Sequence, residues 1–505
     1  MSKFLRLHQI IKSFNTAEKR HFTLLANLNK RDQNYLSLYG LIDKQENYDE
    51  KSLSKSIDKK GIKNVSIEKK NLENALLKSL RVFHEKSSHR QVGYTILKNI
   101  ENYIDKGLFD IAKELINKNE TYFLGIENYS QLIMLYEYKE TLMNKTVAST
   151  TRGEWNEFYK RKEEAINKLL TINNYRALER QILLVFKTSN FQRMTAEDKL
   201  IVERVINSPL ITDYSKADSF DSRYRFFYIQ GLISIMNNRL DEQPKWFRKI
   251  LDLLEENPKL NTSYHRDFYF LTYNNYLNAL LMTKSYKKTQ IEFNRASQMF
   301  DKTTSSFNLA LYYTIKLSYV VETGDVKESK QLIDEVTLLL EQQHRTIGDS
   351  IQRSLLLNLS VLLFIEQQYD KSLKILNDLI NKEHYDSLSE QMTFIRAFIL
   401  FIYLEQNNID MIEYYLNQLK YFLKSKNKLD LFEKYIIQFF NDFLKTEKLE
   451  KDNLKNLKSN LEKNDQEGFV DIFLKYFNLM AWTESKITNK KLVEVLYSET
   501  IAKED

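Results

Sequence analysis

One sequence pattern, a helical hairpin, occurs three times between about Ser306 and Leu423, and it limits how this chain can fold more than any other feature. Its clearest copy, Leu355–Ile380, reads as an apolar helix, a short polar break, an aromatic residue and a second amphipathic helix. Two further copies are Leu309–Val336 and Phe394–Leu419, and a weaker one begins at Phe268. A helical hairpin alone leaves one face of each helix unburied, so the copies must stack to close a core. The repeat therefore predicts a solenoid of antiparallel helical hairpins.

The composition is that of an all-α protein. The 505 residues include three prolines and ten glycines, which is few for a chain of this length. Turn-rich β architectures need Gly and Pro at special backbone angles, so their scarcity indicates helices joined by short loops. The absence of cysteine excludes disulfide scaffolds, thiolate metal sites and thiol nucleophiles. We therefore expect an all-α solenoid with a large buried core.

The N-terminal sequence and the apolar runs predict a cytoplasmic protein without a membrane span. The first residues, MSKFLRLHQIIKSF, are basic but contain no uninterrupted apolar region and no small-residue cleavage site, unlike a secretion signal. The longest apolar run, Leu355–Ile365, is interrupted by Asn358 and Ser360 and is too short to cross a bilayer. The excess of Lys, Asn, Ile and Tyr over Ala and Gly resembles the usage of bacteria with AT-rich genomes.

Small residues recur at one place in the hairpins, three positions after the residue that opens the second helix. The pairs with this spacing are Phe109 and Ala112, Tyr286 and Thr289, Val326 and Ser329, and Tyr369 and Ser372. The copy at Ile409 departs from the pattern, because the bulky Ile412 takes the small position. From about Ser88 to Lys428 this rhythm resembles the tetratricopeptide repeat (TPR), in which the small residue lets the two helices approach closely.

The spacing of the copies differs from that of the TPR. The residues that open successive second helices, from Tyr286 to Ile409, lie 40, 43 and 40 residues apart. The standard TPR is about 34 residues long, whereas HEAT-type repeats are about 40–47 residues long. HEAT-like packing therefore stays open for the same stretch. We expect a basic N-terminal helical module over residues 1–87, a TPR-like solenoid over residues 88–428 and capping helices over residues 429–505.

Positive charge is concentrated at the N-terminal end. Residues Met1–Arg90 hold nineteen Lys and Arg against ten Asp and Glu, whereas the whole chain has a net charge of +7. This asymmetry predicts an anionic partner for the N-terminal module, nucleic acid first among them.

Two interpretations of residues 1–87 stay open. In the first, Asp49–Ile57 and Ser66–His84 form a helix-turn-helix whose second helix is exposed toward a major groove. In the second, the module is a helical cap on the solenoid and its lysines are merely solvated. The second is favoured because the break between the two helices is longer than the usual tight turn. The candidate nucleic-acid-binding residues are Lys59, Lys60, Lys63, Lys69, Lys70, Asn71 and Asn74.

Familiar catalytic and metal-binding patterns do not occur in the sequence. The seven histidines form no HExxH arrangement, and the nearest pair, His84 and His89, is five residues apart and does not share a helical face. No G-x-G-x-x-G, P-loop or G-x-S-x-G motif is present. We therefore expect a protein that is not an enzyme and that holds no metal or cofactor.

The resemblance to the TPR implies that the inner face of the first helices holds a partner peptide, often through asparagines that bind the peptide backbone. Asn274 and Asn278 lie one turn apart on the helix before Tyr286, with Tyr273 beside them. We predict that Tyr273, Asn274 and Asn278 bind a protein or peptide. The alternative is that they cap or solvate a groove that has no ligand.

The expected function is that of a non-enzymatic scaffold or adaptor that binds a protein or peptide on its concave face. The main alternative is a nucleic-acid-linked regulator with a basic N-terminal helix-turn-helix and a TPR-like sensor. Bacterial regulators that join a helix-turn-helix to TPR-like repeats offer a fold-level analogy for this alternative.

Overall fold

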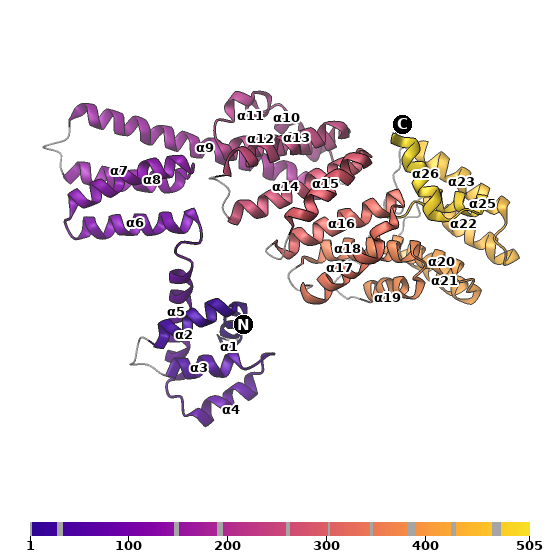
Figure 1. The fold of residues 1–505 in the computed structure, drawn as a ribbon, viewed down its shortest axis with the longest axis horizontal. Coiled ribbons are helices and arrows are strands. Elements are labelled where there is room, and N and C mark those ends of the chain that lie inside the picture. Colours follow the sequence, from indigo (N-terminus) through magenta and orange to yellow (C-terminus); the bar gives the residue numbers. More distant parts are fainter. Residues whose placement is uncertain are drawn as a thin grey trace. The chain divides into compact units, whose positions relative to one another are not determined.

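The computed structural model in Figure 1 describes residues 3–27, 34–145, 151–188, 195–258, 263–300, 304–343, 347–381, 390–425, 431–466 and 476–504. Every regular element in these ranges is a helix, and they contain no strand. The all-α prediction is therefore confirmed. The helices pack pairwise in sequence order, as in a helical repeat.

The chain divides into two compact units. The first unit comprises residues 1–177, 215–223 and 258–264, and the second comprises residues 178–214, 224–257 and 265–505.

The first unit contains two hydrophobic clusters. One cluster includes Leu7, Phe22, Leu38 and Leu72 and lies among the five N-terminal helices. These helices are α1 (Lys3–Ser13), α2 (Thr16–Asn27), α3 (Asn34–Asp43), α4 (Glu50–Lys60) and α5 (Val65–Phe83). The other cluster, around Ile100, lies among the next four. These helices are α6 (His89–Asp105), α7 (Phe109–Gly125), α8 (Tyr129–Lys145) and α9 (Arg152–Thr188), and the division between the two units falls within α9.

The helices that follow α9 lie mostly in the second unit and include the four hairpins of the repeated pattern. Before the hairpins come α10 (Ala196–Ile206), α11 (Pro209–Thr212), α12 (Phe220–Met236) and α13 (Gln243–Glu256). The first helices of the hairpins are α14 (Ser263–Met282), α16 (Ser306–Thr323), α18 (Asp349–Ile365) and α20 (Glu390–Glu405). The second helices are α15 (Tyr286–Met299), α17 (Ser329–Gln343), α19 (Tyr369–Ile380) and α21 (Ile409–Ser425). The chain continues through α22 (Leu431–Thr446), α23 (Lys451–Gln466), α25 (Leu479–Thr488) and α26 (Leu492–Glu504).

A residue in the left-handed conformation follows the first helix of each hairpin. The φ angle is 53° at Lys284, 68° at Gly324, 59° at Gln367 and 53° at Asn407. In the α18–α19 turn, the N–H of Gln367 donates to the carbonyl of Phe364 (2.9 Å) and the N–H of Gln368 donates to that of Leu363 (2.8 Å). Such paired bonds satisfy the last carbonyls of a helix and reverse the chain. The second helices begin at the predicted residues, except that the 3₁₀ turn Val326–Glu328 precedes α17.

The predicted small residues are packed inside their hairpins. Ala112, Thr289, Ser329 and Ser372 each have at most 3% of their surface exposed. The hydroxyl of Ser372 donates to the carbonyl of Ser360 in α18 (2.8 Å), so α18 and α19 are in direct contact there. Ile412 is also fully buried, which shows that the α20–α21 hairpin accommodates a larger side chain at this position.

The middle first helices are buried on every side. All residues of α18 from Leu357 to Ile365 are buried, and so are all residues of α20 from Ala397 to Leu404. A helix with one face in solvent keeps that face polar, whereas a helix that is apolar all round needs cover on all sides. The stacked hairpins cover only part of α18 and α20.

The C-terminal helices supply the remaining cover. The ring of Phe477 lies 5.3 Å from that of Phe364 in α18 and 5.0 Å from that of Phe398 in α20. Trp482 in α25 is 1% exposed, and its indole N–H donates to Oε1 of Glu405 (2.8 Å). Helix α26 packs against α16. The chain therefore returns along the first helices after the last hairpin.

We expect Gly324→Ala to loosen the contact between α16 and α26. A Cβ atom on Gly324 would lie 2.8 Å from the carbonyl oxygen of Val493 and 2.9 Å from Cβ of Leu496. The overpacking should lower the free energy of unfolding by about 1–3 kcal/mol. An alanine in the left-handed backbone conformation should lower it further, by about 1–2 kcal/mol. Hydrogen exchange measured by mass spectrometry should show faster exchange of the α26 backbone amides.

Gly107→Ala is the matched control, because Gly107 has a φ of 72° and no atom within 4 Å of its Cβ position. It should leave the exchange of α26 unchanged. Unchanged α26 exchange in Gly324→Ala would contradict the tight approach.

Candidate functional site

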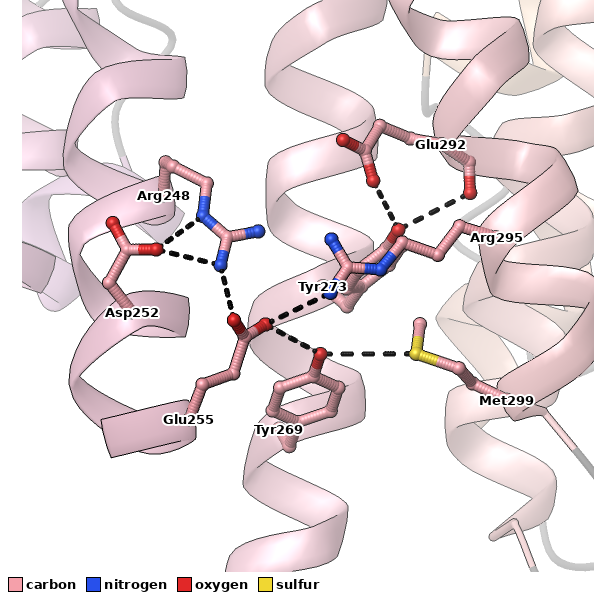
Figure 2. A network of polar contacts seen from close by, with 8 residues as sticks. All are labelled: Arg248, Asp252, Glu255, Tyr269, Tyr273, Glu292, Arg295 and Met299. Atoms are coloured by element: carbon pink, nitrogen blue, oxygen red, sulfur yellow. Dashed lines mark hydrogen bonds and ion pairs between the residues drawn. The ribbon is translucent and has the colours of Figure 1, made fainter. Parts of the chain in front are cut away.

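The predicted peptide-binding residue Tyr273 lies inside the protein. Its side chain is 0% exposed, and its hydroxyl donates to the carboxylate of Glu292 and to the carbonyl of Glu292 (3.3 Å). Burial and then the hydrogen bond to Glu292 raise the pKa of Tyr273 well above its ordinary value. Tyr273 is therefore a neutral donor that ties α14 to α15, as Figure 2 shows.

A network of charged residues surrounds Tyr273 and joins α13, α14 and α15 (Figure 2). Arg248 contacts the carboxylates of Asp252 (2.7 Å) and Glu255 (2.8 Å). The hydroxyl of Tyr269 donates to Oε1 of Glu255 (3.0 Å), and Arg295 lies 3.5 Å from the same oxygen. Burial and the Glu255 charge raise the pKa of Tyr269 to about 12. Both arginines pair with carboxylates, and Glu292 accepts from the neutral hydroxyl of Tyr273, so the network holds the three helices together.

Asn274 also contacts the protein itself. It is 1% exposed, and its Nδ2 donates to the carbonyl of Asn308 in α16 (2.9 Å). A second bond joins the same two helices, because Nδ2 of Asn308 donates to the carbonyl of Asp267 in α14 (3.2 Å). In the next hairpin, Nδ2 of Asn358 donates to the carbonyl of Thr314 (3.3 Å). Buried asparagines thus link α14 to α16 and α16 to α18.

Asn278 is the one exposed member of the predicted trio, and its Nδ2 lies 3.5 Å from the sulfur of Met282. The structure therefore does not bring Tyr273, Asn274 and Asn278 together on one accessible surface. Burial of the first two corrects the expectation that they face a ligand, since helix packing already occupies them.

A groove lined by α15, α16 and α17 was not predicted from the sequence. It has a volume of about 600 Å³ and is called here the α15–α17 groove. Its main lining residues are Gln290, Asn294, Ser297, Tyr312, Tyr313, Lys316, Tyr319, Gln331 and Glu335. The available signals were the adjacent pair Tyr312–Tyr313 and the amides at Gln290 and Asn294, which are one helical turn apart.

Aromatic rings form the apolar part of the α15–α17 groove. Tyr312 stacks on Phe300 with ring centroids 4.8 Å apart and meets Phe293 edge-on at 5.8 Å. Burial and the Glu335 charge raise the pKa of Tyr313 to about 12, so this phenol stays neutral, and its hydroxyl is hydrogen-bonded to the carboxylate of Glu335. The opposite charges of Lys316 and Glu328 lie 3.4 Å apart at the edge.

Amide side chains form the polar part of the groove. Nε2 of Gln290 donates to Oδ1 of Asn294 (3.3 Å), and Nε2 of Gln331 donates to Oε1 of Glu335 (2.8 Å). Each amide has two N–H donors and one oxygen, so these contacts leave further hydrogen-bonding capacity. The groove can therefore receive both an apolar side chain and polar backbone groups.

A second cavity, of about 540 Å³, is lined by α7, α8 and α9. Beneath it the buried Glu120 contacts Lys139 (2.8 Å) and Arg161 (3.4 Å) and accepts from the hydroxyl of Tyr136 (3.0 Å). Burial alone would raise the pKa of Glu120, but these partners hold it below its usual value. The charges here compensate one another and indicate a structural ion cluster.

The connection between α4 and α5 is shorter than predicted. Helix α4 continues to Lys60, beyond the expected end at Ile57, so residues 61–64 alone separate it from α5. Gly61 ends α4 with a φ of 64°, and its N–H donates to the carbonyl of Asp58 (3.0 Å). The long break that favoured a cap over a helix-turn-helix is therefore absent.

Most of the predicted nucleic-acid-binding side chains are accessible. Lys59, Lys60, Lys63, Lys70 and Asn74 are exposed. The other two depart from the prediction, because Asn71 is partly buried and the Lys69 ammonium lies 3.2 Å from the centre of the Phe4 ring.

Within the described ranges, no group of three His, Cys, Asp or Glu residues is placed to hold a metal ion. No helix in those ranges is both long enough and apolar enough to cross a membrane. The chain matches no protein-family model, no curated protein and no solved structure.

We expect Asn274→Ala to destabilise the fold and Asn278→Ala to have little effect. The first change removes the buried side-chain hydrogen bond from α14 to the carbonyl of Asn308, which should lower the free energy of unfolding by about 0.5–1.5 kcal/mol. The second removes an exposed amide and should change it by less than about 0.5 kcal/mol. Urea unfolding followed by circular dichroism measures both. Equal effects of the two variants would contradict a linking role for Asn274.

Proposed function

We propose that the protein is a non-enzymatic scaffold built on TPR-like hairpins and that it holds a segment of a partner protein in the α15–α17 groove. The observation that carries this proposal is the combination of aromatic rings with amide side chains in one groove of about 600 Å³. Ligand sites are typically concave and apolar with a few well-placed polar groups. The regular left-handed turns and buried small residues support the TPR-like reading.

The site differs from the concave face expected from the sequence. On that face the first helices α16, α18 and α20 are covered by the chain's own C-terminal helices, with Phe477 and Trp482 filling the space. A partner reaches α18 and α20 there only if those helices leave. The α15–α17 groove needs no such displacement, because Asn294, Ser297 and Gln331 are exposed.

The lining also defines the chemistry of the partner. Gln290, Asn294 and Ser297 follow one face of α15, so they offer a row of neutral donors and acceptors to a peptide backbone. The partly exposed ring of Tyr313, backed by the buried ring of Tyr312, offers apolar contact area. The segment we expect is extended, nearly uncharged and anchored by one aromatic or aliphatic side chain.

Peptides selected against the full chain from a random display library test this proposal. Selected peptides should carry an apolar anchor and should bind the variant Ser297→Trp about tenfold or more weakly, because anchors in such pockets contribute more than about 1–2 kcal/mol. The matched control is Ile291→Trp, since Ile291 is 66% exposed on the same helix and does not line the groove. Fluorescence anisotropy gives the affinities. Peptides that bind both variants equally would contradict the groove as the site.

A further inference from the structure

The end of α4, the following turn and the first half of α5 form a continuous basic stretch. Lys59, Lys60, Lys63 and Lys70 are exposed and form no ion pair within the described residues. Between residues 59 and 70 the one acidic residue is Glu68, whose side chain is 7% exposed. Of the flanking acidic residues, Asp58 is exposed and Glu73 pairs with Arg6, so the five lysines of the stretch leave it with a net positive charge.

The packing of α5 fixes which of its side chains reach solvent. Leu72 and Leu76 are 0% exposed in the core of the module, where α5 packs against α2 and α3. Ile67 (57% exposed), Lys70 and Asn74 lie on another face of the helix and are accessible. An exposed isoleucine between lysines has no stabilising role in the module core.

We propose that the surface formed by Lys59, Lys60, Lys63, Ile67, Lys70 and Asn74 binds duplex DNA. The first half of α5 enters the major groove, and the lysines at the end of α4 and in the turn contact phosphates. The four-residue turn with its left-handed Gly61 is typical of a helix-turn-helix, in which the second helix reads base edges. This proposal does not depend on the α15–α17 groove.

The exposed side chains of α5 match the groups that a major groove presents. An aliphatic side chain such as Ile67 contacts the thymine methyl group, a lysine such as Lys70 donates to guanine O6 and N7, and an asparagine such as Asn74 bonds adenine N6 and N7. Residues 59–74 contain no aromatic residue. Single-stranded nucleic acid is bound largely by stacking on aromatic rings, so the surface favours the duplex.

Anisotropy titrations of the full chain against a labelled short duplex test the proposal at about 50 mM and about 200 mM salt. The duplex should bind at the lower salt concentration and weaken steeply at the higher one. Changing Lys59, Lys60 and Lys63 together to Gln should reduce the slope of log affinity against log salt by about 2.7, since each lost phosphate contact removes about 0.9. Asn74→Ala should relax the base preference in a randomised duplex pool and leave the salt slope unchanged.

The matched control changes Lys106, Lys113 and Lys118 to Gln, which removes the same charge from exposed positions of α6–α7. This control variant should bind the duplex with the same affinity and the same salt dependence as the unaltered chain. Absence of duplex binding at the lower salt concentration would overturn the proposal, as would equal loss in the control or tighter binding of single-stranded DNA or RNA of the same sequence. Circular dichroism melting of each variant separates lost binding from lost folding.

Discussion

Burial of two stretches, Leu357–Ile365 of α18 and Ala397–Leu404 of α20, is the constraint on which the second unit depends. These stretches are apolar on nearly every side, with Asn358 and Ser360 as the buried exceptions in α18, and the neighbouring hairpins can cover only part of each helix. The rest of the cover is provided by Phe477 and Trp482, far along the chain. The row of hairpins is thus covered along α18 and α20 by residues that come later in the same chain.

The hairpins were predictable because their signals are local. Apolar periodicity and the small residues at Thr289 and Ser372 depend on neighbours within one hairpin. Except for α17, which a 3₁₀ turn precedes, the second helices begin where these signals place them. The C-terminal cover was not predictable in the same way, since the sequence around Phe477 does not indicate which distant helices it packs against. The all-round apolar character of α18 and α20 was a usable sign that such a cover exists.

The candidate site shows a different limit, because one residue type serves two purposes. The amide of an asparagine can bind a peptide backbone or a neighbouring helix equally well. The amide of Asn274 binds the neighbouring helix α16. The sequence spacing of Asn274 and Asn278 cannot tell which of them faces inward. In the N-terminal module the error was a helix end: three further residues of α4, up to Lys60, convert a long break into a tight turn.

The late position of Phe477 and Trp482 in the sequence affects how the second unit forms during synthesis. The ribosome synthesises α18 and α20 well before Phe477 and Trp482, so the apolar sides of these two helices stay uncovered until those residues have emerged. Nascent chains with such uncovered surface are prone to aggregate and depend on chaperones. Truncation of the chain before Phe477 would therefore leave the apolar sides of α18 and α20 without the cover that Phe477 and Trp482 provide.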